Sequence, residues 1–280
     1  EHTKMIKDAV NIPVFIGHNV FTPEDAERLL EEGVGDYVAL GRSQLADPCW
    51  AKKAKEGKAE DIKPCINCLI GCLDRGLLSH SPIHCTVNPT LYKFEGPEIT
   101  PAEEQKNVAV VGAGPAGSEA ALTLAKRGHK VTIFEKRDFG GAMIEASVPD
   151  NKSNIRRLIQ YYKNHIEAND AITIVKEEAD FDKIANGGFD AVILAIGGKT
   201  RTLKVAEDGK NTLIYANDYL NGSKKAIGDK VVVIGGGITG AETALELKNE
   251  GKDVTIVEMA DQFLASNSSA CQAYSISISQ

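Results

Sequence analysis

Residues 108–136 read VAVVGAGPAGSEAALTLAKRGHKVTIFEK, and residues 231–259 read VVVIGGGITGAETALELKNEGKDVTIVEM. The two stretches share 14 identities in 29 positions at a constant offset of 123. Each has a β-branched run that predicts a strand, a G-x-G-x-x-G turn, a helical stretch, and a second strand ending in a glutamate. The pattern predicts two strand–loop–helix–strand units of a parallel α/β fold.

The three glycines of each turn have separate tasks. The first allows the tight turn, the second lets the backbone approach a pyrophosphate, and the third lets helix and strand pack closely. The pyrophosphate would lie on the helix N-terminus, where free N–H groups favour anions. Because the whole context occurs twice, we expect two dinucleotide sites rather than glycines that only make tight turns. The expected contacts are Gly112, Gly114, Pro115, Ala116 and Gly117 in the first unit and Gly235, Gly237 and Gly240 in the second.

A glutamate, Glu135 or Glu258, closes each unit. A carboxylate at this point can accept hydrogen bonds from ribose hydroxyls but repels a 2′-phosphate. No arginine follows Glu258 in VEMADQ, so we expect the second unit to prefer NADH over NADPH. The alternative is a strand-end glutamate that is merely solvated.

Four of the six cysteines gather in a short segment, as Cys65, Cys68, Cys72 and Cys85. Four thiolates suit an iron–sulfur cluster or zinc. A structural zinc site more often uses two paired C-x2-C knuckles, whereas here three ligands lie close together and one comes from further along the chain. We expect a [4Fe–4S] cluster, with zinc and unliganded thiols as the alternatives. Cys49 and Cys271 have no partner at a suitable spacing.

The rest of the chain supports the same α/β reading. Strands are predicted over residues 12–16 and 36–40, with helices from Thr22-Pro23 to Gly33 and over 47–57. Residues 59–104 have little periodicity and form a connector that holds the cysteines. Between the glycine units we expect a helix near 154–169, strands at 171–175 and 191–198, and after them a final helix that begins near Ser268.

Composition is that of an ordinary soluble globular protein, with 42% hydrophobic and 25% charged residues. A net charge of -7 argues against a nucleic-acid partner. No apolar run is long enough to predict a membrane span. Clustered cysteines with metal-site spacing predict a reducing, cytoplasmic location.

Short sequence motifs also resemble those of flavoproteins of the disulfide-reductase type. GAGPAGSEAA resembles their FAD-type loop and GGGITGAETA their nicotinamide-type loop. FGGAMIEASVP (139–149) resembles a flavin-contacting loop, and ILAIGG (193–198) resembles a strand-ending signature near the dinucleotides. The resemblance implies that the first unit binds FAD, with Lys136, Gly141 and Gly197 among its contacts.

A more specific resemblance covers essentially the whole chain. PCINCLIGC (64–72) and HCTVNP (84–89), preceded by ALGRSQLADPCW (39–50), resemble the 2-enoate reductase and 2,4-dienoyl-CoA reductase family. The resemblance implies the end of an FMN-binding TIM barrel, an iron–sulfur connector, and tandem Rossmann-like FAD and NAD(P) domains. The expected bounds are 1–58, 59–104, 105–225 and 226–280. We therefore expect the sequence to be a piece of a longer chain.

In a TIM barrel, the phosphate of a flavin sits at the loops after the last two strands. The resemblance maps these loops onto Gly17, Asn19, Gly41 and Arg42, with Arg42 as the phosphate cation. His18-Asn19 departs from the more glycine-rich turn of the family, which leaves the role of Asn19 open. The alternative for Arg42 is an ordinary surface arginine at a strand end.

The resemblance implies an NADH-dependent reductase of activated C=C bonds, with electrons passing from NADH to FAD, [4Fe–4S], FMN and an unsaturated small molecule. An amine-dehydrogenase-like flavoprotein that passes electrons to a partner protein is the alternative, and a redox-inert domain is a third. A homo-oligomer is compatible with either enzyme. The catalytic acid is expected upstream of Glu1, so the sequence names neither that acid nor the substrate.

Overall fold

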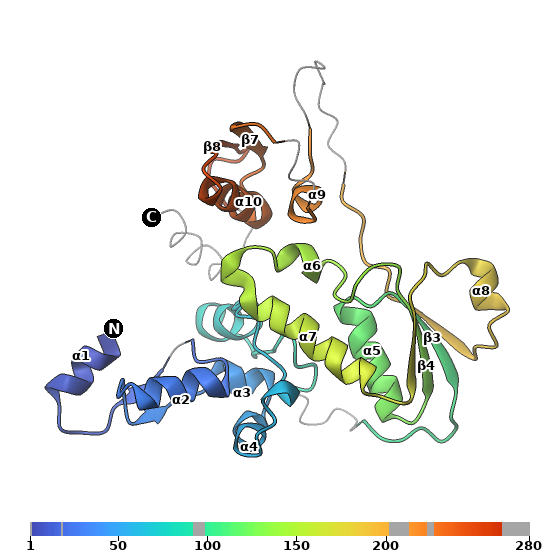
Figure 1. Ribbon diagram of the computed structural model, residues 1–280, viewed down its shortest axis with the longest axis horizontal. Helices are drawn as coiled ribbons and strands as arrows, with labels where there is room; N and C mark the ends of the chain where they lie inside the picture. The colour runs from blue at the N-terminus through green and yellow to red at the C-terminus, as the bar shows by residue number, and fades with distance from the viewer. Residues whose placement is uncertain (1, 18, 92–98, 202–212, 223–226, 265–280) are drawn as a thin grey trace. The chain divides into compact units, whose positions relative to one another are not determined.

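The computed structural model shows two compact units, Glu1–Gly96 and Pro97–Gln280 (Figure 1). The residues that it describes are 2–17, 19–91, 99–201, 213–222 and 227–264. The helix predicted near Ser268 lies outside these residues. Both units combine helices with parallel strands, which confirms the mixed α/β class.

The first unit alternates helices with two short strands. Its elements are α1 (His2–Ala9), β1 (Phe15–Ile16), α2 (Pro23–Glu31), β2 (Tyr37–Val38), α3 (Arg42–Ala46) and α4 (Trp50–Lys55). Strands β1 and β2 pair in parallel, with Ile16 opposite Val38. The two strands are confirmed in position but are shorter than the sequence predicts. Helix α3 is an element that the sequence analysis missed.

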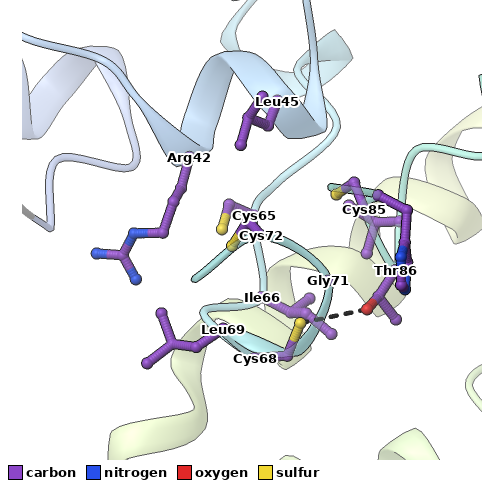
Figure 2. Close-up of a pocket in the computed structure, with 12 residues that line it drawn as sticks. Arg42, Leu45, Cys65, Ile66, Cys68, Leu69, Gly71, Cys72, Cys85 and Thr86 are labelled. Atoms are coloured by element: carbon purple, nitrogen blue, oxygen red, sulfur yellow. Dashed lines mark hydrogen bonds between the residues drawn. The ribbon is translucent and has the colours of Figure 1, made fainter. Parts of the chain in front are cut away.

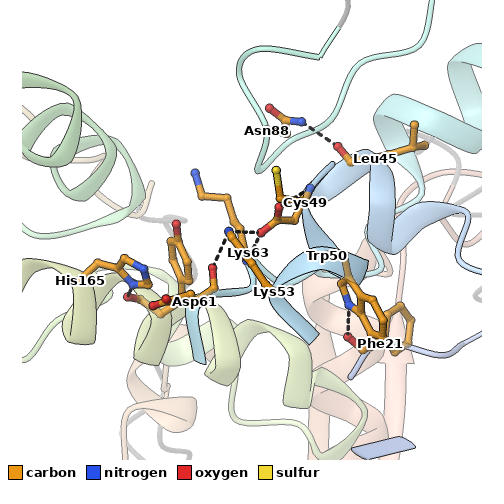
Figure 3. Close-up of polar contacts among 11 residues, drawn as sticks. Phe21, Leu45, Cys49, Trp50, Lys53, Asp61, Lys63, Asn88 and His165 are labelled. Atoms are coloured by element: carbon orange, nitrogen blue, oxygen red, sulfur yellow. Dashed lines mark hydrogen bonds and ion pairs between the residues drawn. The ribbon is translucent and has the colours of Figure 1, made fainter. Parts of the chain in front are cut away.

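Helix α2 begins as its sequence predicts. Thr22 Oγ1 accepts a hydrogen bond from the Asp25 backbone N–H at 3.1 Å, and Pro23 occupies the first helical position. Its apolar side packs on a core that includes the buried side chain of Trp50, whose Nε1 donates to the Phe21 carbonyl at 3.2 Å (Figure 3). This core fixes the loops after β1 and β2 side by side.

The connector has more structure than its sequence predicts. It contains a short 3-10 turn, η1 (Ala59–Asp61), and a wide π-helical segment, η2 (Ile70–Leu78). Two glycines of η2 explain its close packing on the segment that follows. A Cβ on Gly71 would lie 2.3 Å from the His84 carbonyl oxygen, and one on Gly76 would lie 2.4 Å from the Ile83 side chain. These glycines let residues 83–84 lie against η2, which brings Cys85 towards Cys72.

The second unit begins with a four-stranded parallel sheet in the order β5-β4-β3-β6. Its strands are β3 (Asn107–Val111), β4 (Lys130–Phe134), β5 (Ile172–Val175) and β6 (Ala191–Leu194). The helices are α5 (Pro115–Lys126), α6 (Met143–Ala146), α7 (Ser153–Glu167) and α8 (Phe181–Ala185), with the 3-10 turn η3 (Asp150–Lys152) before α7. Val110 and Ile133 are fully buried on the central strands, as is Ile166 of α7. The helix predicted near 154–169 and the strand predicted at 171–175 are confirmed, whereas the strand predicted at 191–198 ends at Leu194.

The same unit then repeats its opening pattern. After α9 (Ala216–Leu220) come β7 (Lys230–Ile234), α10 (Ile238–Asn249) and β8 (Asp253–Val257), and β7 pairs with β8 in parallel. The bounds of these three elements are those of β3, α5 and β4 shifted by 123 residues. The predicted internal repeat is therefore a structural repeat.

Candidate functional site

The first glycine loop joins β3 to α5 and has no room for side chains. Gly112 has φ +104, and a Cβ there would lie 2.5 Å from the Ala195 carbonyl oxygen. A Cβ on Gly117 would lie 1.9 Å from the Gly112 carbonyl oxygen. Gly114 precedes α5, Pro115 takes its first position, and no described side chain caps the helix. The first turn of α5, which includes Ala116, therefore keeps its backbone N–H groups available to an anion.

The second glycine loop reproduces this geometry between β7 and α10. Gly235 has φ +106, and a Cβ on Gly240 would lie 1.9 Å from the Gly235 carbonyl oxygen. Gly237 precedes α10, and again no described side chain caps the helix. Two helix N-termini in one unit thus have the same backbone arrangement.

Both strand-end glutamates bind their own glycine loop. Glu135 Oε2 accepts from the Ala113 N–H at 2.8 Å, and Glu258 Oε2 accepts from the Gly236 N–H at 2.6 Å. A backbone hydrogen bond from the Ala260 N–H at 2.9 Å, together with the one from the Gly236 N–H, holds the pKa of Glu258 below its usual range. Each carboxylate therefore lies at the mouth of its own loop.

Three further predicted contacts surround the first loop or lie near it. Gly141, with φ +53, packs against Gly114, because a Cβ on it would lie 2.9 Å from the Gly114 Cα. Gly197, with φ +70, follows β6. Lys136 instead forms an exposed ion pair with Glu178 at 2.5 Å. Gly141 is thus the one of the three whose packing on the loop is direct.

The residues that are predicted to bind the FMN phosphate lie at the ends of β1 and β2. Arg42 Nη2 donates to Asn19 Oδ1 at 2.8 Å, and Asn19 has φ +58. Asn19, Gly41 and Arg42 line a pocket of about 490 Å³. Gly17 lies two residues before Asn19 in the chain. His18 lies outside the described residues. The buried Ser43 Oγ donates to the Val20 carbonyl at 2.7 Å and so ties the two loops together.

All four clustered cysteines line one neighbouring pocket (Figure 2). Cys65 Sγ accepts a hydrogen bond from the Asn67 N–H at 3.4 Å, and Cys68 Sγ lies 3.2 Å from Thr86 Oγ1. Burial raises the pKa of Cys65 to about 11, opposed by the Asn67 N–H and by the charge of Arg42. Burial also raises the pKa of Cys85. The thiols of Cys65 and Cys85 thus hold their protons at neutral pH unless a metal displaces them.

Two anchors hold the cysteine segment against α3. The buried carboxylate of Asp47 accepts from the Lys63 N–H at 2.9 Å and from Lys53 Nζ at 2.6 Å, and Lys53 also donates to the Asp61 carbonyl (Figure 3). After the last cysteine, Asn88 Nδ2 donates to the Leu45 carbonyl at 2.9 Å. Sequence reasoning missed both anchors because neither Asp47 nor Asn88 belongs to a recognisable spacing.

The four thiols around one pocket fit an iron–sulfur cluster. A zinc ion with bonds of about 2.3 Å would draw its thiolates within about 4 Å of one another. Among the described residues, no three His, Cys, Asp or Glu side chains are close enough to share one ion. Four soft donors, three of them with hydrogen-bond partners, are the kind of ligand set that holds an iron–sulfur unit.

Two uncapped glycine loops on parallel strands, each with a strand-end acid beside it, define an α/β protein of the dinucleotide-binding class. The profile of the pyridine nucleotide-disulphide oxidoreductase family matches residues 106–276, so the chain belongs to that family, and its relatives place it in the 2-enoate and 2,4-dienoyl-CoA reductase group.

Curated relatives support the assignment. A cinnamate reductase of Clostridium sporogenes is 36% identical over 97% of this chain and 40% of its own length. An NADH oxidase of Thermoanaerobacter brockii is 42% identical over 91% of this chain and 40% of its own length. A solved structure of a 2-naphthoyl-CoA reductase matches 98% of this chain and 42% of its own, with a TM-score of 0.88 and 32% identity. The chain spans about 40% of the length of the curated relatives it matches.

No helix in the described part of the chain is sufficiently long and apolar to cross a lipid bilayer.

Proposed function

We propose that this chain carries the electron-input part of an NADH-dependent reductase of activated C=C bonds, of the enoate or enoyl-CoA type. The bound cofactors supply the redox chemistry, in the order NADH, FAD, [4Fe–4S], FMN and substrate. The observation that carries the proposal is that Arg42 lines both the cysteine pocket and the pocket at the ends of β1 and β2. One side chain thus joins the predicted cluster site to the predicted FMN phosphate site.

The protein's own groups bind and orient the cofactors. The first-turn N–H groups of α5 and α10 would hold the FAD and NADH pyrophosphates, while Glu135 and Glu258 would turn from their loops to the ribose hydroxyls. Cys65, Cys68, Cys72 and Cys85 would hold the cluster. Arg42 and Asn19 would hold the FMN phosphate.

The composition test is direct. Protein prepared without oxygen is expected to contain iron and sulfide near four each per chain, since a cubane has four of each, with visible absorption that bleaches under dithionite. Stoichiometric zinc without iron would exclude the cluster.

The activity test uses the full-length enzyme under anaerobic conditions. NADH oxidation is measured against enoates, enoyl-CoA thioesters and simple amines. Oxidation of NADH by unsaturated acids or thioesters supports the proposal. Reduction of the flavin by amines, with no unsaturated acceptor able to oxidise NADH, would favour the amine-dehydrogenase alternative.

A further inference from the structure

The guanidinium of Arg42 lies between two asparagines from different loops. Its Nη2 donates to Asn19 Oδ1 at 2.8 Å, and its Nη1 donates to Asn67 Oδ1. Asn19 belongs to the loop after β1, whereas Asn67 lies between Cys65 and Cys68. Figure 2 shows Arg42 extending from its helix beside the cysteine segment. One cation is therefore tied to both pockets.

The backbone of Asn67 makes this link possible. Asn67 has φ +57, a left-handed conformation that asparagine tolerates better than most residues. In that conformation its backbone N–H donates to Cys65 Sγ at 3.4 Å while its side-chain oxygen accepts from Arg42. Asn67 thus contacts a cysteine through its backbone and the arginine through its side chain.

Two anionic groups would compete for the same cation. Arg42 favours negative charge in the cysteine pocket, because its side chain lines that pocket together with the four cysteines. It also lines the neighbouring pocket, where Asn19 and Gly41 would meet a phosphate. Its other contact is the Phe21 ring, 5.6 Å from the guanidinium carbon to the ring centroid, which supplies no negative charge of its own.

We propose that Asn67 is a positioning residue that holds Arg42 between the two pockets, so that a bound phosphate group and added negative charge in the cysteine pocket oppose each other. The inference rests on the proposed function, because it requires a cluster at the cysteines. Such coupling is reciprocal: phosphate makes the cluster harder to reduce, and reduction weakens phosphate binding by the same factor.

The test uses full-length protein with its cluster and without FMN. The midpoint potential of the cluster is measured by EPR-monitored titration in inorganic phosphate and in chloride at equal ionic strength. We expect a lower potential in phosphate, and phosphate binding about fivefold weaker to reduced than to oxidised protein. Equal potentials in the two salts would overturn the proposal even before any variant is made.

The variant Asn67→Gly isolates the side chain. Glycine keeps the left-handed backbone and its N–H to Cys65, and it removes only the contact with Arg42. His80→Gly is the matched control, since His80 is exposed and also has positive φ, at +47. We expect full iron content in both variants, with the phosphate effect on the potential lost only in Asn67→Gly.

The outcomes separate the two proposals. Wild-type protein without iron would overturn the proposed function. Wild-type protein with a cluster but no phosphate effect, or an Asn67→Gly variant with full iron and an unchanged phosphate effect, would overturn the role of Asn67 alone.

Discussion

The two glycine loops have nearly identical local geometry in very different surroundings. Gly112 and Gly235 have φ of +104 and +106, and Gly117 and Gly240 each leave only 1.9 Å for a Cβ. Among the residues that the structure describes, the first loop lies on a four-stranded sheet and the second on a two-stranded one. The loop geometry is therefore set by the short sequence of each unit, while burial of the strands depends on which neighbours pack around them.

Burial at matched positions shows the difference. Val110 on β3 is fully buried, whereas Val233, its counterpart on β7, is partly buried. Val232 on β7 is 62% exposed, and its counterpart Ala109 is 0% exposed. Substitutions at matched positions should therefore change the free energy of unfolding equally in the glycine loops. They should change it unequally in the strands, where burial differs.

The largest effect is expected at the third glycines. Gly117→Ala should lower the free energy of unfolding around β3 by about 3 kcal/mol, because the new Cβ overlaps a backbone oxygen that cannot move aside. Gly240→Ala meets the same overlap and should cost a similar amount around β7. Amide hydrogen exchange of the two strands measures both local free energies.

Gly198→Ala and Gly228→Ala are the controls for these two variants, since a Cβ at either position meets nothing within 4 Å. If Gly117→Ala were as harmless as Gly198→Ala, the steric reason for the loop glycines would be wrong.

The second-largest effect on the free energy of unfolding should differ between the sheet that contains β3 and the sheet that contains β7. Val110→Ala removes two methyl groups from a fully buried site and should cost about 2 kcal/mol. Val233→Ala makes the same change at a partly buried site and should cost about half as much. The same hydrogen-exchange measurement reports both. Equal costs would mean that the two-stranded sheet encloses its core as fully as the four-stranded sheet does.

Much of the fold could be predicted because its signals are local. The glycine turns, the cap of α2 at Thr22 and the periodicity of α7 each need only a few neighbouring residues. The short strands β1 and β2 and the π-helical η2 were harder, because their extent depends on packing between distant segments. Gly71 illustrates this point, since its role requires His84 to lie against it.

The candidate site likewise contains residues that the sequence singles out and residues that it does not. The four cysteines that the spacing singles out line one pocket, and their role as metal ligands stays a prediction. Asp47, Asn67 and Thr86 escaped prediction because each acts through one contact made in three dimensions. The assignment of these groups to a cluster, and of the loops to FAD, FMN and NADH, stays a prediction.

The smallest expected effect separates the two glutamates by function. In the full-length enzyme, Glu258→Ser should reduce the preference for NADH over NADPH by roughly tenfold, because the contact between the carboxylate and the ribose 2′-hydroxyl is lost. Glu135→Ser is the matched control, since Glu135 makes the same contact with its own loop. It should weaken FAD binding and leave the coenzyme preference unchanged. The measurement is the ratio of kcat/KM for the two coenzymes at constant FAD content. An unmodified enzyme that prefers NADPH would contradict the role of Glu258 in coenzyme choice. A Glu135→Ser variant that shifts the ratio as far as Glu258→Ser would show that the two loops do not have separate roles.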